Sequence, residues 1–380
     1  MIDTASRQRL RALVKKESLQ IMRDPSSIAI AFILPIVLLF LFGYGVSLDA
    51  KDIPVGIVVE QPDAATQSLS GSFEQSDYFT PSYFHSIQRA EQALTEGKIQ
   101  GIVWLKSNFA RYLLSYSPVS GTQAVIAVRV NGVDSNQANL TLGYIQGVWL
   151  TWLTQFSQAR GVEMALPVQM EHRVWFNPAV SSRLFLVPGL VAIIMTLIGS
   201  LLTAMVVARE WDRGTMEALM VTSLRNVEFI AGKLIPYFFL GMASLVVTVF
   251  LSMVIFSVPY TGSFWLLLLT GALFMLVSLA IGLLISIVSK SQFVAGQVAI
   301  IVSFLPAFIL SGFIFDINSM PLPIQVITHI VPARYFVAIL QTLFLAGDIW
   351  PVILANVAAL LILLLIFSLL VAKNTRKRLE

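Results

Sequence analysis

The chain has 380 residues, of which 57% are hydrophobic and only 12% are charged, and its mean hydropathy is +0.80. A soluble domain carries about 25% charged residues, so this composition excludes a water-soluble globule and indicates an integral membrane protein. The absence of cysteine excludes a disulfide scaffold, a thiolate metal site and a cysteine nucleophile. The net charge is +4, but most Lys and Arg flank apolar runs, which indicates membrane orientation rather than nucleic-acid binding.

Residues 1–27 have the amphipathic pattern of a helix that lies at the membrane interface. The apolar side chains fall on one side of such a helix and the basic ones on the other, as an interfacial helix requires. The apolar set is Leu10, Leu13, Val14, Ile21 and Met22.

Six apolar runs are each long enough to cross the hydrocarbon core as a helix, which takes about 20 residues. They cover residues 28–48, 184–208, 234–258, 264–288, 294–315 and 352–372. The first run is long, follows a polar segment and ends without a small-x-small cleavage site, so it is predicted to be an uncleaved anchor. The predicted fold class is therefore mainly α: a polytopic membrane protein with six transmembrane helices.

Basic residues predict the orientation, because Lys and Arg concentrate on the cytoplasmic side of membrane spans. Those close to span ends are Arg7, Arg9, Arg11, Lys15, Lys16 and Arg23 before the first span, Arg209, Arg213, Arg225 and Lys233 between the second and third, Lys290 after the fourth, and Lys373, Arg376, Lys377 and Arg378 after the last. Both termini are expected to be cytoplasmic, with 373–380 as a basic tail. Residues 49–183 are then expected outside.

The segment 49–183 has the composition of a soluble domain and alternates between strand-like and helix-like patterns. The strand-like runs are 53–60, 99–105 and 123–130, and the helix-like ones are 64–75, 86–95, 107–115 and 136–158. This alternation predicts an extracytoplasmic α/β domain. His85 and His172 have no companion at metal-ligand spacing, so the domain is interpreted as a binding or docking element with no metal site and no catalytic residue.

The helix of the second span ends in a cluster of charged residues, Arg209, Glu210, Asp212 and Arg213. Gly214-Thr215 then interrupts the helix. A short amphipathic helix is predicted near residues 211–226, with Thr215 as its cap and Glu217 in its first turn, where a negative charge suits the helix dipole. Such a helix is either a connector on the membrane surface or a coupling helix that contacts a partner protein. The residues alone leave both interpretations open.

This stretch resembles the signature of the ABC-2 permease family. The resemblance rests on Arg209-Glu210, Asp212-Arg213 and Gly214-Thr215, and it continues into 232–237, a Gly-Lys-Leu-x-Pro-Tyr entry to the next span. Further matching motifs are Lys16-Glu17, Arg23-Asp24-Pro25, Phe42-Gly43-Tyr44-Gly45, Leu310-Ser311-Gly312-Phe313 and Pro332-Ala333-Arg334-Tyr335-Phe336. The large external insertion narrows the resemblance to YbhS-like permeases of Gram-negative bacteria.

The resemblance implies a subunit of the bacterial inner membrane that pairs with a second permease, identical or paralogous, in the lipid bilayer. It also implies a separate ABC ATPase subunit that binds ATP and Mg, because this chain has no GxxxxGK[ST] loop. A periplasmic membrane-fusion adaptor is a further expected partner, and nucleic acid is not. The expected ATPase-coupling residues are Arg209, Glu210, Arg213, Gly214, Thr215 and Glu217. The resemblance also implies an interfacial elbow helix at the cytoplasmic membrane surface within 1–27, with Lys16, Glu17 and Arg23 as its elbow residues. An external re-entrant segment is expected near 316–350.

The central portions of the spans contain essentially no charge, which argues against a proton- or sodium-coupled transporter. By similarity to the family, spans two and five are expected to line a pathway, with Thr196, Ser200, Phe304, Phe308, Ser311 and Phe315 as candidate residues. The three phenylalanines are expected on one side of span five, where an uncharged aromatic wall suits hydrophobic or amphipathic drugs. Ordinary helix packing would use the same residues, and the sequence does not separate the two interpretations.

Three functions are therefore compared. The family resemblance favours an ATP-driven export permease. The alternative is a non-transporting receptor or docking protein that presents the external domain. A membrane enzyme has no supporting acid, base, metal or nucleophile constellation.

Overall fold

The structure is a computed structural model that describes residues 4–45, 52–109, 113, 126–132, 135–159, 181–217, 225–289 and 291–375. The chain divides into two compact units. The helical unit is Met1–Ser47 with Arg173–Glu380, and the α/β unit is Leu48–His172.

Among the described residues of the helical unit, six helical segments are long and apolar enough to cross a membrane, which confirms the predicted polytopic fold. Two of them are composite, each containing a π-helical turn. The segments are α2 (Pro25–Ile28) with η1 (Ala29–Ile33) and α3 (Leu34–Gly45); α8 (Ser182–Asp212); α10 (Asn226–Phe256); α11 (Phe264–Ser289); α12 (Gln292–Ala299) with η2 (Ile300–Phe304) and α13 (Leu305–Leu310); and α16 (Trp350–Asn374). Helix α1 (Thr4–Met22) precedes them.

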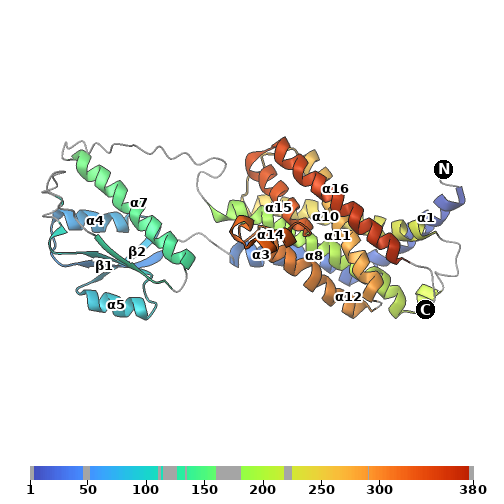
Figure 1. Cartoon of the computed structure of the whole chain (residues 1–380), viewed down its shortest axis with the longest axis horizontal. Helices are drawn as coiled ribbons and strands as arrows, with labels where there is room; N and C mark the ends of the chain where they lie inside the picture. The colour runs from blue at the N-terminus through green and yellow to red at the C-terminus, as the bar shows by residue number, and fades with distance from the viewer. Residues whose placement is uncertain are drawn as a thin grey trace. The chain divides into compact units, whose positions relative to one another are not determined.

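Helix α8 forms the centre of the helical unit (Figure 1). Of its most apolar stretch 89% is buried, against 17% for α16. Its neighbours include α3, α10, α11 and α12. A helix that is apolar all round and covered on every side belongs in the core, whereas the other spans keep a face for lipid.

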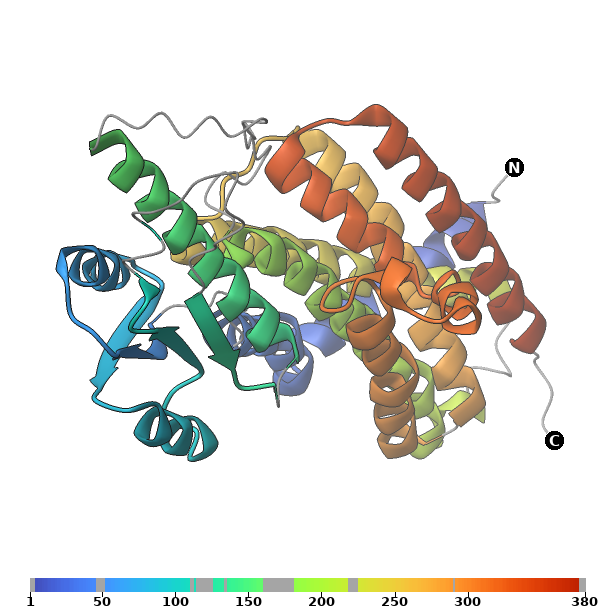
Figure 2. The same ribbon diagram turned by 60° about the vertical axis from the view of Figure 1, so that its left-hand side comes forward.

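Two short helices follow the fifth span and bend sharply. Helix α14 (Leu322–Thr328) and the segment formed by α15 (Pro332–Gln341) and η4 (Thr342–Ala346) meet at 82°, the geometry of a broken span or a re-entrant loop. Phe336 of α15 stacks on Phe274 of α11 with ring centroids 4.1 Å apart, so α15 is packed inside the bundle. The chain then turns back into α16, which runs beside α15 (Figure 2).

The proline in the first span is compensated by a neighbouring helix. Pro35 has no N–H, so it cannot donate to the carbonyl of Ala31 four residues earlier. The hydroxyl of Ser244 on α10 donates to that carbonyl instead. Both Ala31 and Ser244 are buried, and this bond attaches the first span to α10.

Ser244→Ala is expected to lower the free energy of unfolding by about 1–3 kcal/mol, because it leaves a buried carbonyl without this donor. Ser252→Ala is the matched control. Ser252 is equally buried on the same helix, but its hydroxyl donates only within the helix, to the carbonyl of Val249 at 2.7 Å. Thermal unfolding in nanodiscs should separate the two variants, and equal losses would contradict this account.

The α/β unit contains a four-stranded sheet in the order β2-β1-β3-β4. Its elements are β1 (Ile53–Val59), α4 (Ala64–Glu74), β2 (Phe79–Phe84), α5 (Ile87–Thr95), β3 (Gly101–Leu105), β4 (Ile126–Val130) and α7 (Ser135–Ala159). Strands β1, β2 and β3 are parallel, and β4 is antiparallel to β3. Helices α4 and α7 cover one face and α5 the other (Figure 1), so β1 is buried on both faces.

The sheet confirms the predicted α/β class, and it corrects one detail. Strand β2 was not predicted, because Pro81 interrupts its pattern and most of its side chains are not buried. It is an edge strand, where a missing backbone donor is tolerated. The helix expected at 107–115 falls largely outside the described residues, as does His172, and His85 is exposed.

Candidate functional site

Buried charges gather where α1, α8 and α10 meet, at the end of the helical unit where α8 ends and α10 begins. Lys233 of α10 is the centre of this ion cluster. Its Nζ lies 2.7 Å from Oε1 of Glu17 on α1 and 2.8 Å from Oε1 of Glu210 on α8, and all three side chains are buried. Lys16 approaches from the exposed side, with its Nζ 3.0 Å from the same oxygen of Glu210. The two positive charges of the lysines therefore balance the two negative charges of the glutamates.

Helical spacing explains why α1 contributes a buried acid. Leu13, Glu17 and Ile21 recur every four residues, so they share one face, and all three are buried. Met22 was expected on this face, but it is 73% exposed, because it lies one residue, about 100°, further round the helix. Lys16 and Glu17 join the ion cluster, whereas Arg23 is exposed.

A second ion pair fixes the link between α1 and the first span. Nη2 of Arg209 lies 2.9 Å from Oδ2 of Asp24. The same oxygen accepts a hydrogen bond from Ser27 Oγ at 2.8 Å, and Oδ1 accepts one from Ser26 N at 3.1 Å. Partial burial raises the pKa of Asp24, but the Ser27 bond and the charge of Arg209 outweigh it and hold that pKa below its usual range. Asp24 therefore caps α2 as a carboxylate and attaches it to α8.

A third contact attaches the start of α1 to α10. Glu228 accepts hydrogen bonds from Ser6 Oγ at 2.6 Å and from Arg9 Nη2 at 2.9 Å, and it caps its own helix through the backbone N of Arg225 at 3.0 Å. Nearby, Asn226 Nδ2 donates to the carbonyl of Thr375 at 2.8 Å, so the end of α16 meets the same place. One end of the bundle thus unites four helices.

The expected coupling residues fall into two groups. Arg209 and Glu210 are buried in the contacts just described, whereas Arg213, Gly214 and Glu217 are exposed. Gly214 ends α8 with φ +67°, a left-handed conformation that favours glycine. Residues 218–224, in the middle of the expected coupling helix, lie outside the described part of the chain.

Thr215 connects these two groups. It was expected to cap the following helix, but its hydroxyl donates back to Glu210, to the carbonyl oxygen at 3.3 Å and to the carboxylate. The exposed turn is therefore bonded directly to the acid that Lys233 holds. Sequence reasoning missed Lys233, Glu228 and Asp24 as site residues. The available signal was a lysine at the mouth of an apolar run, which requires a counter-ion when buried.

Two expected pathway residues are buried inside the helical unit. Thr196 and Ser200 are 3% and 0% exposed on the central helix α8, and their hydroxyls donate to carbonyls one turn earlier in α8, at 2.8 Å each. A role for them in a pathway between two permeases stays a prediction. Ser311 is also buried, and its Oγ accepts from the backbone N of Phe313 at 3.3 Å.

The phenylalanines of span five do not share one side. Phe304 and Phe308 are 5.8 Å apart between ring centroids, and Phe308 contacts Phe42 of the first span at 5.5 Å. Phe315 lies beyond the end of α13 at Leu310, after a turn with Gly312 at φ +82°, and it is 56% exposed. Phe313 takes the expected place, 5.8 Å from Phe308.

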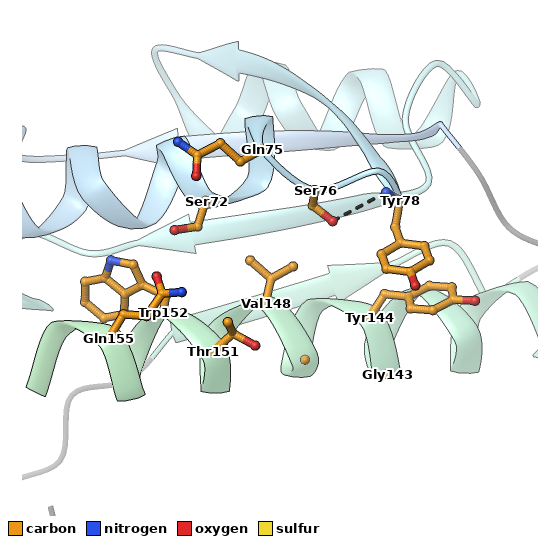
Figure 3. A pocket seen from close by; sticks show the side chains of 11 residues that line it. Ser72, Gln75, Ser76, Tyr78, Gly143, Tyr144, Val148, Thr151, Trp152 and Gln155 are labelled. Carbon is orange, nitrogen blue, oxygen red and sulfur yellow. Dashed lines mark hydrogen bonds between the residues drawn. The ribbon is translucent and has the colours of Figure 1, made fainter. Parts of the chain in front are cut away.

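The α/β unit has a cavity of about 420 Å³ between α4 and α7 (Figure 3). None of the side chains that line it is charged: they are Ser72, Gln75, Ser76, Tyr78, Gly143, Tyr144, Gly147, Val148, Thr151, Trp152 and Gln155. Tyr78 and Tyr144 stack at one end, 4.4 Å apart. Among the residues that the structure describes, no group of His, Asp and Glu could hold a metal ion.

An apolar six-span bundle with an inserted α/β unit defines a polytopic membrane protein. The family described as ABC-2 family transporter protein matches residues 25–373, and the chain belongs to it. The probable multidrug ABC transporter permease YbhS of Escherichia coli K12 is 43% identical over 373 residues, 98% of each chain. YbhR of the same organism is 25% identical over 354 residues, covering 91% of this chain and 94% of the relative, and NatB of Bacillus subtilis is 25% identical over 383 residues, covering 94% and 95%. These findings confirm the resemblance found from the motifs.

Proposed function

We propose that this permease is the membrane subunit of an ATP-driven exporter and that separate ATPase subunits drive it from the end of the bundle that holds the ion cluster. The observation that carries the proposal is the bonding of the exposed turn 213–217 to Lys233 through Thr215 and Glu210. Force applied to this turn by a partner would reach α1, α8 and α10 together, because each contributes a member of the ion cluster.

The distribution of basic residues supports the cytoplasmic position of this end. Arg9, Lys16 and Arg213 all lie there, as expected for the inner face of a bacterial inner membrane. The α/β unit would then face the periplasm. Its uncharged cavity between α4 and α7 is a candidate contact for a periplasmic adaptor.

The proposed cargo is hydrophobic or amphipathic. Phe304 and Phe308 are partly buried aromatic residues on span five, and their neighbours Ile301 and Leu305 are exposed and apolar. A second permease, identical or paralogous, would cover part of this surface and enclose an apolar pathway. YbhS and YbhR carry names of probable multidrug permeases, which is consistent with such cargo.

The test replaces exposed residues of the turn, Arg213→Glu and Glu217→Lys together, in the full complex. We expect ATP-dependent export to fall by at least about tenfold, since a charge reversal at a protein contact costs several kcal/mol, while the unfolding temperature stays unchanged. Lys373→Glu, at the same end but on α16, is the control. Unchanged export in the double variant would reject the proposed coupling. Absence of any co-purifying ATPase would favour a receptor instead.

A further inference from the structure

A second cavity lies at the opposite end of the helical unit from the ion cluster. It has a volume of about 580 Å³ and is bounded by Phe185 at the start of α8, the turn after α13, α15 and the second turn of α16. Its lining includes Arg334, Asp316 and the amide side chains of Asn318, Gln341 and Asn356. One cation and one anion therefore share a cavity that also has apolar walls and three side-chain amides.

The cation is held in place by its own neighbours. Nη1 of Arg334 donates to the carbonyl of Gln325 at 3.4 Å and to the hydroxyl of Thr328, and it lies 3.1 Å from Nδ1 of His329. A guanidinium has five N–H donors. Among the described residues, Nε and Nη2 of Arg334 make no hydrogen bond, so these donors remain for a ligand in the cavity.

The anion is likewise held apart from the cation. Oδ1 of Asp316 accepts hydrogen bonds from the backbone N and the side-chain N of Asn318, both at 3.2 Å, and it caps the short 3-10 turn η3 (Ile317–Ser319). Within the described part of the chain, no ion pair joins Asp316 to Arg334 at 4.0 Å or less. Opposite charges that line one cavity without meeting suit a ligand that carries both signs.

Exposed tryptophans indicate the depth of this cavity in the membrane. Trp265 and Trp350 are 75% and 55% exposed in the first turns of α11 and α16, at the end where the cavity lies. Tryptophan concentrates at the level of lipid head groups. A ligand in this cavity would therefore sit at head-group depth, with Phe185, Ile314 and Val337 beside its apolar part.

We propose that this cavity binds a zwitterionic phosphate–ammonium group of the phosphoethanolamine type. Arg334 would bind the phosphate, for which a guanidinium provides matching donors, and Asp316 would bind the ammonium. A simple anion would be repelled by Asp316 and a simple cation by Arg334. The group can belong to a phospholipid or to a soluble compound, and the apolar walls favour the lipid. The proposal does not depend on an ATPase or on export.

The experiment is native mass spectrometry of the full chain with phosphatidylethanolamine and phosphatidylglycerol of identical acyl chains. The wild type should prefer phosphatidylethanolamine about tenfold, the worth of one charge-assisted hydrogen bond. Asp316→Asn keeps a good capping residue and should abolish the preference, with phosphatidylglycerol still bound. Arg334→Gln should lose both lipids, and Arg334→Lys should retain them in part.

Arg183→Gln is the matched control, since Arg183 is exposed near the start of α8 but does not line the cavity. Competition by glycerophosphoethanolamine would show that the head group alone suffices, and its failure would show that the acyl chains are required; both results support the site. Equal binding of the two lipids by the wild type, or an unchanged preference in Asp316→Asn, would overturn the proposal.

Discussion

Replacing Lys233 with methionine is expected to destabilise the helical unit by about 3–5 kcal/mol, the cost of removing one partner from a buried ion pair. Glu17 and Glu210 would be left facing each other in a buried position, with only the half-exposed Lys16 nearby. Methionine has a similar length and no charge, so the loss measures the charge rather than a cavity. The unfolding temperature in nanodiscs gives the result.

Lys16→Met provides a matched control for this experiment. Lys16 contacts the same oxygen of Glu210 at 3.0 Å, but its side chain is 48% exposed, so its loss should cost only about 0–1 kcal/mol. Adding Glu17→Gln to Lys233→Met should recover part of the stability, because it removes one uncompensated charge. Similar losses in Lys233→Met and Lys16→Met would show that the buried lysine does not hold the three helices together.

The substitution Gly282→Val is expected to prevent correct assembly of α8 and α11. A Cβ on Gly282 would lie 2.2 Å from the carbonyl oxygen of Ser200 and from the hydroxyl of Thr203, and 2.8 Å from the Cα of Ser200. These atoms belong mostly to the backbone of the central helix, so they cannot move aside as a flexible side chain could. Overpacking of a core costs about 1–3 kcal/mol, and more where the backbone must shift. Gly282→Val requires such a backbone shift, so its cost should exceed that range.

Gly296→Ala is expected to have the opposite effect on stability, although Gly296 is also a glycine inside a helix. The nearest atom to a Cβ there is Cδ1 of Leu201 at 3.9 Å, an ordinary contact, and the position is inside helix α12. Alanine should therefore stabilise the helix by up to about 1 kcal/mol. The yield of monodisperse protein and its unfolding temperature should distinguish the Gly282→Val variant from the Gly296→Ala variant. Folded, stable Gly282→Val protein would mean that α8 and α11 do not approach as closely as described.

The spans and the α/β class could be predicted from the sequence because both depend on local patterns. An apolar run of about 20 residues has few alternatives to a membrane helix, and β1 and β3 are continuous apolar strands. Strand β2 was not predicted, because Pro81 and the exposed side chains remove the alternation of apolar and polar residues that marks a strand.

The ion cluster could not be predicted because its members are distant in sequence. Glu17 and Lys233 are 216 positions apart and meet only when α1 packs on α10. Phe315 was misplaced for a different reason. A spacing of i, i+4 and i+11 places three residues on one side only of an uninterrupted helix, but the π-helical turn η2 changes the spacing and α13 ends at Leu310. Helical periodicity is reliable only where the helix is regular.

We propose that a separate ATPase drives this permease through the turn at the end of α8. The most direct measurement is ATP-dependent movement of a hydrophobic dye in proteoliposomes that contain the permease with its ATPase, compared with vesicles that lack either one. The account predicts transport only when both are present and its loss in Arg213→Glu with Glu217→Lys, while ATP hydrolysis continues. Transport by the permease alone, or full transport by the double variant, would contradict it.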